Sequence, residues 1–173
     1  MKGVILDCLK NMVTEKFGAD KWQTIATKSG AKQADRILAS VDFDDKLAVS
    51  LIDSTCQTLN LTFEQVAYLF GEQWMNFYVS KIYAGYVSNV KSSKELFLKL
   101  DSIHSMVTKN MENSRPPKFT YEWINEKTLV MNYISKRNLI DLFVGLAKSV
   151  GKYYKETILV KKLSSTKVQI NFY

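Results

Sequence analysis

The spacing of hydrophobic residues predicts a series of helices in the N-terminal part of the chain. Apolar residues recur every three or four positions between Val4 and Phe17, and a glycine follows them. The same spacing predicts four later helices, over 21–29, 45–59, 63–78 and 93–111. Asp20 is a suitable cap for the second helix. Segments 62–65 and 92–95 both match the capping box, which marks helix starts.

The hydrophobic period changes after the Arg-Pro-Pro segment at 115–117, because a residue that precedes proline avoids the helical conformation. Phe119, Tyr121 and Trp123 alternate with polar residues, which predicts a strand with one buried face. A turn at 125–126 leads to a returning strand. The remaining elements expected are this strand over 129–135, a helix over 137–153, and strands over 157–163 and 167–173.

These elements predict an α+β fold in one domain that spans 1–173. A helical N-terminal part covers about 1–112, with a seam near Asn113. The C-terminal part, about 113–173, forms an antiparallel sheet with one long helix inserted between its hairpins. The length of 173 residues is sufficient for one such domain.

Composition narrows the class of protein further. The net charge is +7, but the lysines and arginines are scattered, so no nucleic-acid partner is expected. Cys8 and Cys56 do not form a disulfide framework, and no stretch approaches the length of a membrane span. We therefore expect a soluble, cytoplasmic protein with no membrane partner.

The sequence lacks common catalytic motifs, such as the phosphate-binding loop and Gly-x-Ser-x-Gly, so no enzymatic activity is expected. Its single histidine, His104, lies on the apolar stripe of a predicted helix, between Leu100 and Val107. Two roles fit this place: a core histidine bonded to a backbone carbonyl, or a neutral imidazole that binds haem iron. Cys8 is a second candidate iron ligand. It ranks lower because buried cysteines on helix faces are common and inert.

A second group of polar residues lies at the end of the returning strand. Because side chains alternate along a strand, Tyr133, Ser135 and Arg137 are expected to point the same way. Two hydroxyls and a guanidinium together suit a carboxylate, and haem carries two of these as propionates. The alternative is an ordinary strand end, where the arginine is solvated and a hydroxyl caps the next helix.

Taken together, these residues resemble the H-NOX (haem-nitric oxide/oxygen binding) family, which includes the sensor domain of soluble guanylate cyclase. The resemblance extends over essentially the whole chain. It rests on Met-Lys-Gly-Val-Ile at 1–5, Leu-Asp-Ser-Ile-His at 100–104, Arg-Pro-Pro at 115–117 and Tyr-Ile-Ser-Lys-Arg at 133–137. The motif Tyr-x-Ser-x-Arg, at this distance after a histidine and a Pro-Pro pair, is highly specific.

The resemblance implies a ferrous haem b between the two parts of the fold, five-coordinate when no gas is bound. It implies that His104 is the axial ligand and the protein's metal ligand. Pro117 matches the proline that presses on the porphyrin and keeps it non-planar. The other matching positions are the propionate ligands Tyr133, Ser135 and Arg137 and the apolar haem contacts Ile5 and Leu146.

Gas selectivity depends on the distal pocket, the side of the haem opposite the histidine. Bound dioxygen is stabilised by a hydrogen-bond donor, and dioxygen-binding members of the family supply a tyrosine. The matching position is Leu142, which has no donor. The pocket is expected to favour NO, and also CO, with the lining residues Ile5, Leu9, Leu142 and Leu146. Trp74 and Tyr78 carry donors near this pocket, so dioxygen binding stays open.

The resemblance also implies signalling. Binding of NO weakens the bond to His104 and shifts its helix against the sheet, and a separate effector reads the altered surface. In bacterial relatives the effector is typically a histidine kinase or a cyclic-di-nucleotide enzyme. The competing hypotheses are a dioxygen or redox sensor on the same haem, a haem enzyme and a basic nucleic-acid-binding module. A single histidine argues against the enzyme, since a peroxidase needs a separate distal acid–base group.

Overall fold

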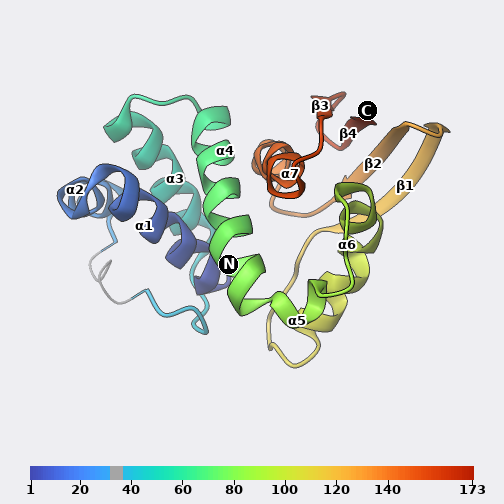
Figure 1. Cartoon of the computed structure of the whole chain (residues 1–173). Coiled ribbons are helices and arrows are strands. Elements are labelled where there is room, and N and C mark those ends of the chain that lie inside the picture. Colours follow the sequence, from blue (N-terminus) through green and yellow to red (C-terminus); the bar gives the residue numbers. More distant parts are fainter. Residues whose placement is uncertain (32–36) are drawn as a thin grey trace.

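The computed structural model describes residues 1–31 and 37–173. Figure 1 shows a helical half beside a half that contains the sheet. The helical half is built from α1 (Gly3–Phe17), α2 (Ala19–Ser29), α3 (Asp45–Leu59) and α4 (Phe63–Gln73). Within the described residues, helices therefore form where the hydrophobic spacing predicts them.

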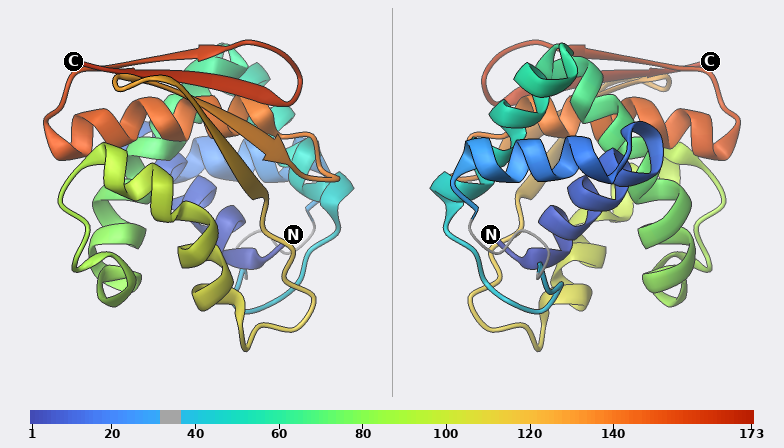
Figure 2. Two further views of the ribbon diagram at one scale, coloured as in Figure 1. Left: turned by 90° about the vertical axis from the view of Figure 1, so that its right-hand side faces the viewer. Right: turned by 90° about the vertical axis from the view of Figure 1, so that its left-hand side faces the viewer.

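The chain then passes into the second half through a π-helix that directly continues α4. The further helices are η2 (Trp74–Ile82), the short α5 (Ala84–Val87) and α6 (Ser93–Thr108). The strands and the inserted helix follow as β1 (Lys118–Asn125), β2 (Thr128–Ile134), α7 (Ile140–Tyr154), β3 (Ile158–Lys162) and β4 (Lys167–Phe172). The sheet has the order β1-β2-β4-β3, and every neighbouring pair is antiparallel. Figure 2 shows α7 running along one face of the sheet, which confirms the expected α+β fold.

Polar side chains begin several of these helices. Thr62 and Gln65 form a complete capping box at the start of α4. At α6 only half of the expected box forms, because the Glu95 carboxylate accepts a hydrogen bond from the backbone of Lys91 instead of Ser92. The expected cap at Asp20 is wrong: α2 begins at Ala19, so Asp20 lies inside its first turn.

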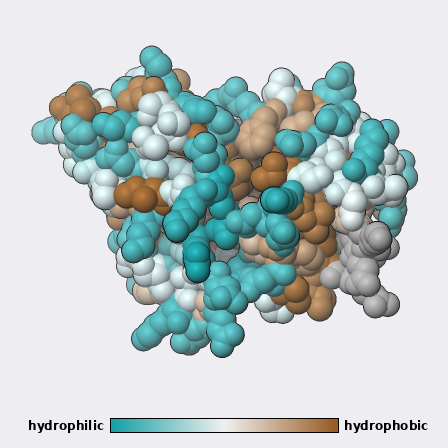
Figure 3. Space-filling model, turned by 180° about the vertical axis from the view of Figure 1, so that it is seen from behind, coloured by the Kyte–Doolittle hydropathy of each residue, from teal (hydrophilic) through white to brown (hydrophobic). Residues whose placement is uncertain are grey.

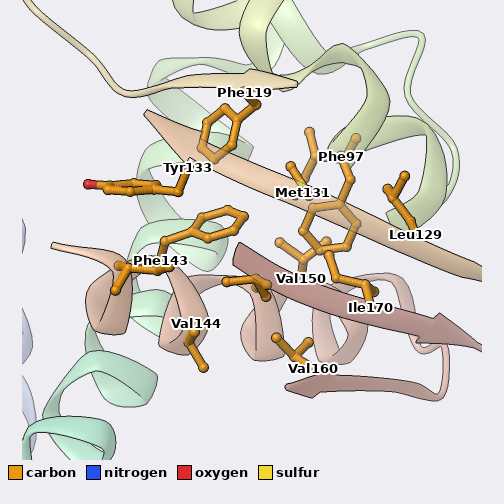
Figure 4. Close-up of a cluster of buried hydrophobic side chains, with 14 of the residues drawn as sticks. Phe97, Phe119, Leu129, Met131, Tyr133, Phe143, Val144, Val150, Val160 and Ile170 are labelled. Atoms are coloured by element: carbon orange, nitrogen blue, oxygen red, sulfur yellow. The ribbon is translucent and has the colours of Figure 1, made fainter. Parts of the chain in front are cut away.

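The first two strands bring aromatic residues onto the inner face of the sheet. Phe119 pairs with Tyr133, and Trp123 pairs with Leu129. Phe119 is buried, whereas Trp123 at the far end of the strand is 40% exposed, so burial follows the predicted alternation only at the start of β1. Figure 4 shows this inner face packed against residues of α6 and α7.

Two hydrophobic clusters form the core. One lies among α1 to α4, and the other lies between the sheet and helices α6 and α7. Although α6 precedes the seam expected near Asn113, its residues Leu96, Phe97 and Ile103 pack with the sheet. Trp74 packs against both clusters, at their boundary. Seen from behind, hydrophobic residues are exposed near the middle of the molecule (Figure 3).

Helix α7 joins the two clusters. Its residues Leu142 and Leu146 pack against the helical cluster, and Phe143 packs into the sheet cluster. The helix approaches α4 so closely that a Cβ on Gly145 would overlap the backbone of Ala67. This close approach brings residues of α7 beside those of α1 and α4, where the distal pocket was expected.

Candidate functional site

His104 lies on α6 with its ring fixed by the backbone. Its Nδ1 is 3.1 Å from the carbonyl oxygen of Pro117. A carbonyl only accepts hydrogen bonds, so Nδ1 carries the proton and Nε2 is left with its lone pair. Burial lowers the pKa of His104, against the opposing hydrogen bond to Pro117 and the charge of Asp101, so the imidazole is neutral at physiological pH. A neutral imidazole held by a carbonyl on its second nitrogen is the arrangement typical of metal-binding histidines.

A cavity of about 300 Å³ adjoins this histidine, between α6 and the segment that leads to the sheet. Its lining residues are Asp101, His104, Ser105, Thr108, Ser114, Arg115, Pro116, Pro117 and Lys118. Asp101, one turn before His104, accepts a hydrogen bond from the backbone of Phe119 at 3.1 Å. Two contacts therefore tie the proline segment and the start of β1 to the helix that bears His104.

The expected strand arrangement of Tyr133, Ser135 and Arg137 is wrong. Strand β2 ends at Ile134, and Ser135 and Arg137 lie in the connection to α7. The backbone N–H of Arg137 donates to the Ser135 hydroxyl at 3.2 Å, which is a turn and not an extended strand. Strand alternation therefore does not place these three side chains on one face.

The Arg137 guanidinium already binds a carboxylate. Its Nε lies 2.9 Å from both carboxylate oxygens of Asp45, and its Nη1 donates to the carbonyl of Arg115 at 2.7 Å. Asp45 also accepts from the N-terminal ammonium of Met1 at 2.8 Å. Partial burial acts to raise the pKa of the Asp45 carboxyl, but these two cations outweigh it, and the pKa lies below its usual value. No motif or spacing in the sequence marks Asp45 as the partner of Arg137.

Aromatic rings form the apolar surface next to His104. The His104 ring lies 5.9 Å from Phe119, which contacts Phe143 at 4.9 Å, as measured between ring centroids. Tyr133 stacks on Phe143 at 6.0 Å. Figure 4 shows the Tyr133 hydroxyl directed away from the neighbouring labelled side chains. The hydroxyl is thus available outside the cluster, while the ring belongs to its core.

The structure brings together three of the four residues expected in the distal lining. Ile5, Leu9 and Leu142 line one apolar cavity of about 10 Å³ among α1, α3, α4 and α7. Leu146 packs against the same cluster. Trp74 lies between Phe70 and Tyr78, and its ring is nearly parallel to Tyr78, with centroids 5.1 Å apart.

Cys8 does not have the properties of an iron ligand. Its side chain is buried, and the thiol lies 3.9 Å from the carbonyl oxygen of Phe70. Burial, with the charges of Asp7 and Glu15, raises the pKa of the Cys8 thiol far above its usual value. Since the thiolate is the form that binds metals, His104 remains the candidate ligand.

A comparison with models of known protein families identifies the family of this chain. A family model described as Haem-NO-binding matches residues 2–162. The chain belongs to the Haem-NO-binding family. This family, also called H-NOX, consists of haem-binding gas-sensor domains and includes those of soluble guanylate cyclases.

Individual relatives agree with this assignment. Soluble guanylate cyclases gcy-32 and gcy-34 of Caenorhabditis elegans are 24% and 25% identical to the chain, over 99% and 88% of its length. The matches cover 26% and 23% of those proteins, so the chain spans about a quarter of the length of these relatives.

Solved structures of H-NOX proteins share the fold. One from S. oneidensis in the Fe(II)NO state has a TM-score of 0.87 and 20% identity, covering 100% of this chain and 99% of its own. The unliganded Fe(II) A71G mutant from K. algicida has a TM-score of 0.85 and 21% identity, covering 100% and 97%. At this identity the likeness establishes the fold alone.

Proposed function

We propose that this chain binds haem b through Nε2 of His104 and senses NO. The observation that carries the proposal is the neutral, carbonyl-held imidazole of a single histidine in a chain of the Haem-NO-binding family. When bound, haem supplies a ferrous iron that takes up a diatomic gas. The donor set fits this group, because one imidazole nitrogen is left with its lone pair and the surrounding rings are apolar.

Arg137, with the hydroxyls of Tyr133 and Ser135, is proposed to hold the haem propionates. The bond between the guanidinium and the Asp45 carboxylate supports this, since it shows that the side chain can be reached by a carboxylate. Asp45 then either competes with a haem propionate for the Arg137 guanidinium or binds the guanidinium together with the propionate. Pro117, Ile5 and Leu146 are proposed to pack against the porphyrin.

The apolar distal residues support NO, and also CO, as the gas ligands. Leu142 has no hydrogen-bond donor, and Ile5 and Leu9 lie with it around one cavity. Bound dioxygen depends on a donor much more than NO and CO do. A sensor of dioxygen or of redox state on the same haem is the second candidate, because Trp74 and Tyr78 carry donors near this cluster.

The signal is proposed to leave through α6. His104 lies near the end of this helix, and the same helix exposes Leu98 and Met106, at 40% and 48%. A shift of α6 changes the surface that these residues present. We propose that a separate effector, such as a histidine kinase or a cyclic-di-nucleotide enzyme, reads this change, and that the described region is a sensor and not an enzyme.

A cytoplasmic location is part of the proposal. The free cysteines Cys8 and Cys56 are consistent with a reducing compartment. Across 1–31 and 37–173, no helix combines the length and hydrophobicity needed to cross a bilayer.

The absorption spectrum of the reduced, haem-reconstituted protein tests the proposal. We expect a five-coordinate ferrous spectrum under argon, no change in air and a shifted Soret band with NO. A stable spectrum of a dioxygen complex would favour the dioxygen sensor. Peroxide turnover faster than that of free haem would favour an enzyme, and the absence of a Soret band would contradict haem binding.

A further inference from the structure

A hydrogen-bond cluster joins α1 to η2 at Tyr78, whose ring packs in the same hydrophobic cluster as the proposed distal residues Leu9 and Leu142. The Tyr78 hydroxyl donates to the Asp7 carboxylate at 2.5 Å. The amide of Asn11, one turn after Asp7, donates to the Tyr78 oxygen at 2.9 Å and to the same carboxylate oxygen at 3.3 Å. A phenol has a single proton to donate, so the bond to Asp7 uses the whole donor capacity of Tyr78.

The position of the Tyr78 ring is strongly constrained. Its side chain is 0% exposed, and it stacks on Trp74 with an angle of 6° between the ring planes. Phe77 contacts it edge-on at 5.2 Å. Because Trp74 packs against both hydrophobic clusters, Tyr78 lies one ring away from the boundary between them. Burial and the neighbouring Asp7 charge also raise the pKa of Tyr78, which keeps the phenol protonated.

We propose that Asp7 and Asn11 sequester the Tyr78 hydroxyl and thereby select against dioxygen. The inference rests on the proposed function, since selection between gases requires a gas-binding haem. Leu142 and Tyr78 then act in the same direction by different means. Leu142 has no donor, whereas Tyr78 has one that is already bonded, so neither stabilises bound dioxygen.

A second reading of the same contacts is a purely structural one, in which Asp7 only fastens η2 to α1. The two readings predict different results when the acceptor is removed. Loss of a fastening lowers stability and leaves gas selectivity unchanged. Loss of sequestration frees the phenol as a hydrogen-bond donor to bound dioxygen, and the resulting stabilisation disappears when the phenol is also removed.

Four variants separate these readings: Asp7→Leu, Asp7→Asn, Tyr78→Phe and the double variant Asp7→Leu/Tyr78→Phe. Leucine at position 7 removes the acceptor at similar size, and asparagine keeps an amide oxygen that accepts the bond. Asp7 is only partly buried, so both substitutions are compatible with folding. For each reduced holoprotein, one sample is titrated with NO, a separate NO-free sample is exposed to air, and the lifetime of the dioxygen complex in the second sample is followed by absorption.

We expect Asp7→Leu to form a dioxygen complex that lasts at least about tenfold longer than any formed by the natural protein, because a hydrogen bond to the partly charged bound dioxygen is worth about this much. Asp7→Asn and Tyr78→Phe should match the natural protein, and the double variant should lose the gain. The inference is overturned if Asp7→Leu binds NO with an unchanged dioxygen lifetime, or if the gain survives in the double variant. Failure of the natural protein to bind haem or NO would instead overturn the proposed function, and this inference with it.

The hydrogen bond itself can be observed without haem. In the haem-free protein, a short bond from a buried phenol to a carboxylate should give a slowly exchanging, strongly downfield hydroxyl proton in the NMR spectrum. The signal should be present in the natural protein and absent from Tyr78→Phe and Asp7→Leu. A natural protein without this signal would contradict the sequestration of Tyr78.

Discussion

The two sides of the proposed site differ in the forces that hold their residues. On the sheet side, polar contacts to the backbone fix the geometry: His104 bonds the carbonyl of Pro117, and Asp101 bonds the N–H of Phe119. On the helical side, Ile5 and Leu142 are positioned by apolar packing around a small cavity. Polar contacts need particular atoms at particular places, whereas apolar packing accepts many side chains of suitable size.

This difference separates two properties of a sensor. In the proposed site, the side with backbone contacts would hold the iron and is expected to tolerate little change. The apolar side can alter which gas is favoured while the attachment stays intact. Substitutions on the sheet side should therefore abolish haem binding or folding, and substitutions on the helical side should change selectivity.

Removing the imidazole should have the largest effect. We expect His104→Gly to lose its Soret band after reconstitution and to regain it with added imidazole, because the chain has no other histidine. Ser102→Gly is the matched control, since it introduces the same flexible residue at an exposed position of α6 outside the lining of the cavity beside His104, and it should bind haem normally. If His104→Gly bound haem as well as the natural protein does, the sheet side would not be the side that attaches the iron.

Truncating the core of α6 should cost the most stability. Phe97 is 1% exposed, so Phe97→Ala is expected to lower the free energy of unfolding by about 3–5 kcal/mol, as measured by urea denaturation. Leu98→Ala, at the neighbouring exposed position, should cost about 0.5 kcal/mol or less. Equal losses from both variants would mean that α6 is not anchored in the sheet cluster.

Arg137→Ala should weaken haem retention without abolishing it. A charge-assisted bond to a propionate is worth about 1.5–3 kcal/mol, so haem transfer to an acceptor protein should be about tenfold to a hundredfold faster. Lys136→Ala removes a charge at the exposed neighbouring position and should have no such effect. If the rate of haem transfer is unchanged in Arg137→Ala, the guanidinium binds Asp45 and does not hold a propionate.

Leu142→Tyr should change selectivity with the smallest effect on stability. A phenol at this position is expected to give a dioxygen complex that lasts at least about tenfold longer than any formed by the natural protein, while haem binding persists. Leu142→Phe adds nearly the same bulk without a hydroxyl and should not do so. If both variants bind dioxygen alike, the size of the side chain causes the change in selectivity, and a hydrogen bond to dioxygen does not.

Local patterns in the sequence predicted most of the fold. The capping box at Thr62 and the strand from Phe119 both depend on neighbouring residues, and both are present, although burial follows the aromatic alternation only at the start of β1. The predicted strand failed at Ser135 because its partner ends: Ile134 opposite Lys118 is the last pair of the ladder between β1 and β2. Beyond that pair, no strand within the described part of the chain holds residues 135–137 extended.

Local patterns of this kind do not predict contacts between residues that are far apart in the sequence. Arg137 and Asp45 are 92 positions apart, and Tyr78 and Asp7 are 71 apart. The π-helix of Trp74–Ile82 also left no signal, since one wider turn changes the hydrophobic spacing too little to detect. His104, by contrast, was identifiable because it is the only histidine in the chain.

Because the chain has one histidine, isotopic labelling tests the central claim most directly. The resonance Raman spectrum of the ferrous, unliganded protein would be recorded with natural and with nitrogen-labelled histidine. We predict an iron–histidine stretching band that shifts on labelling, and the shift can come only from His104. A ferrous spectrum without any band sensitive to the label would contradict His104 as the iron ligand.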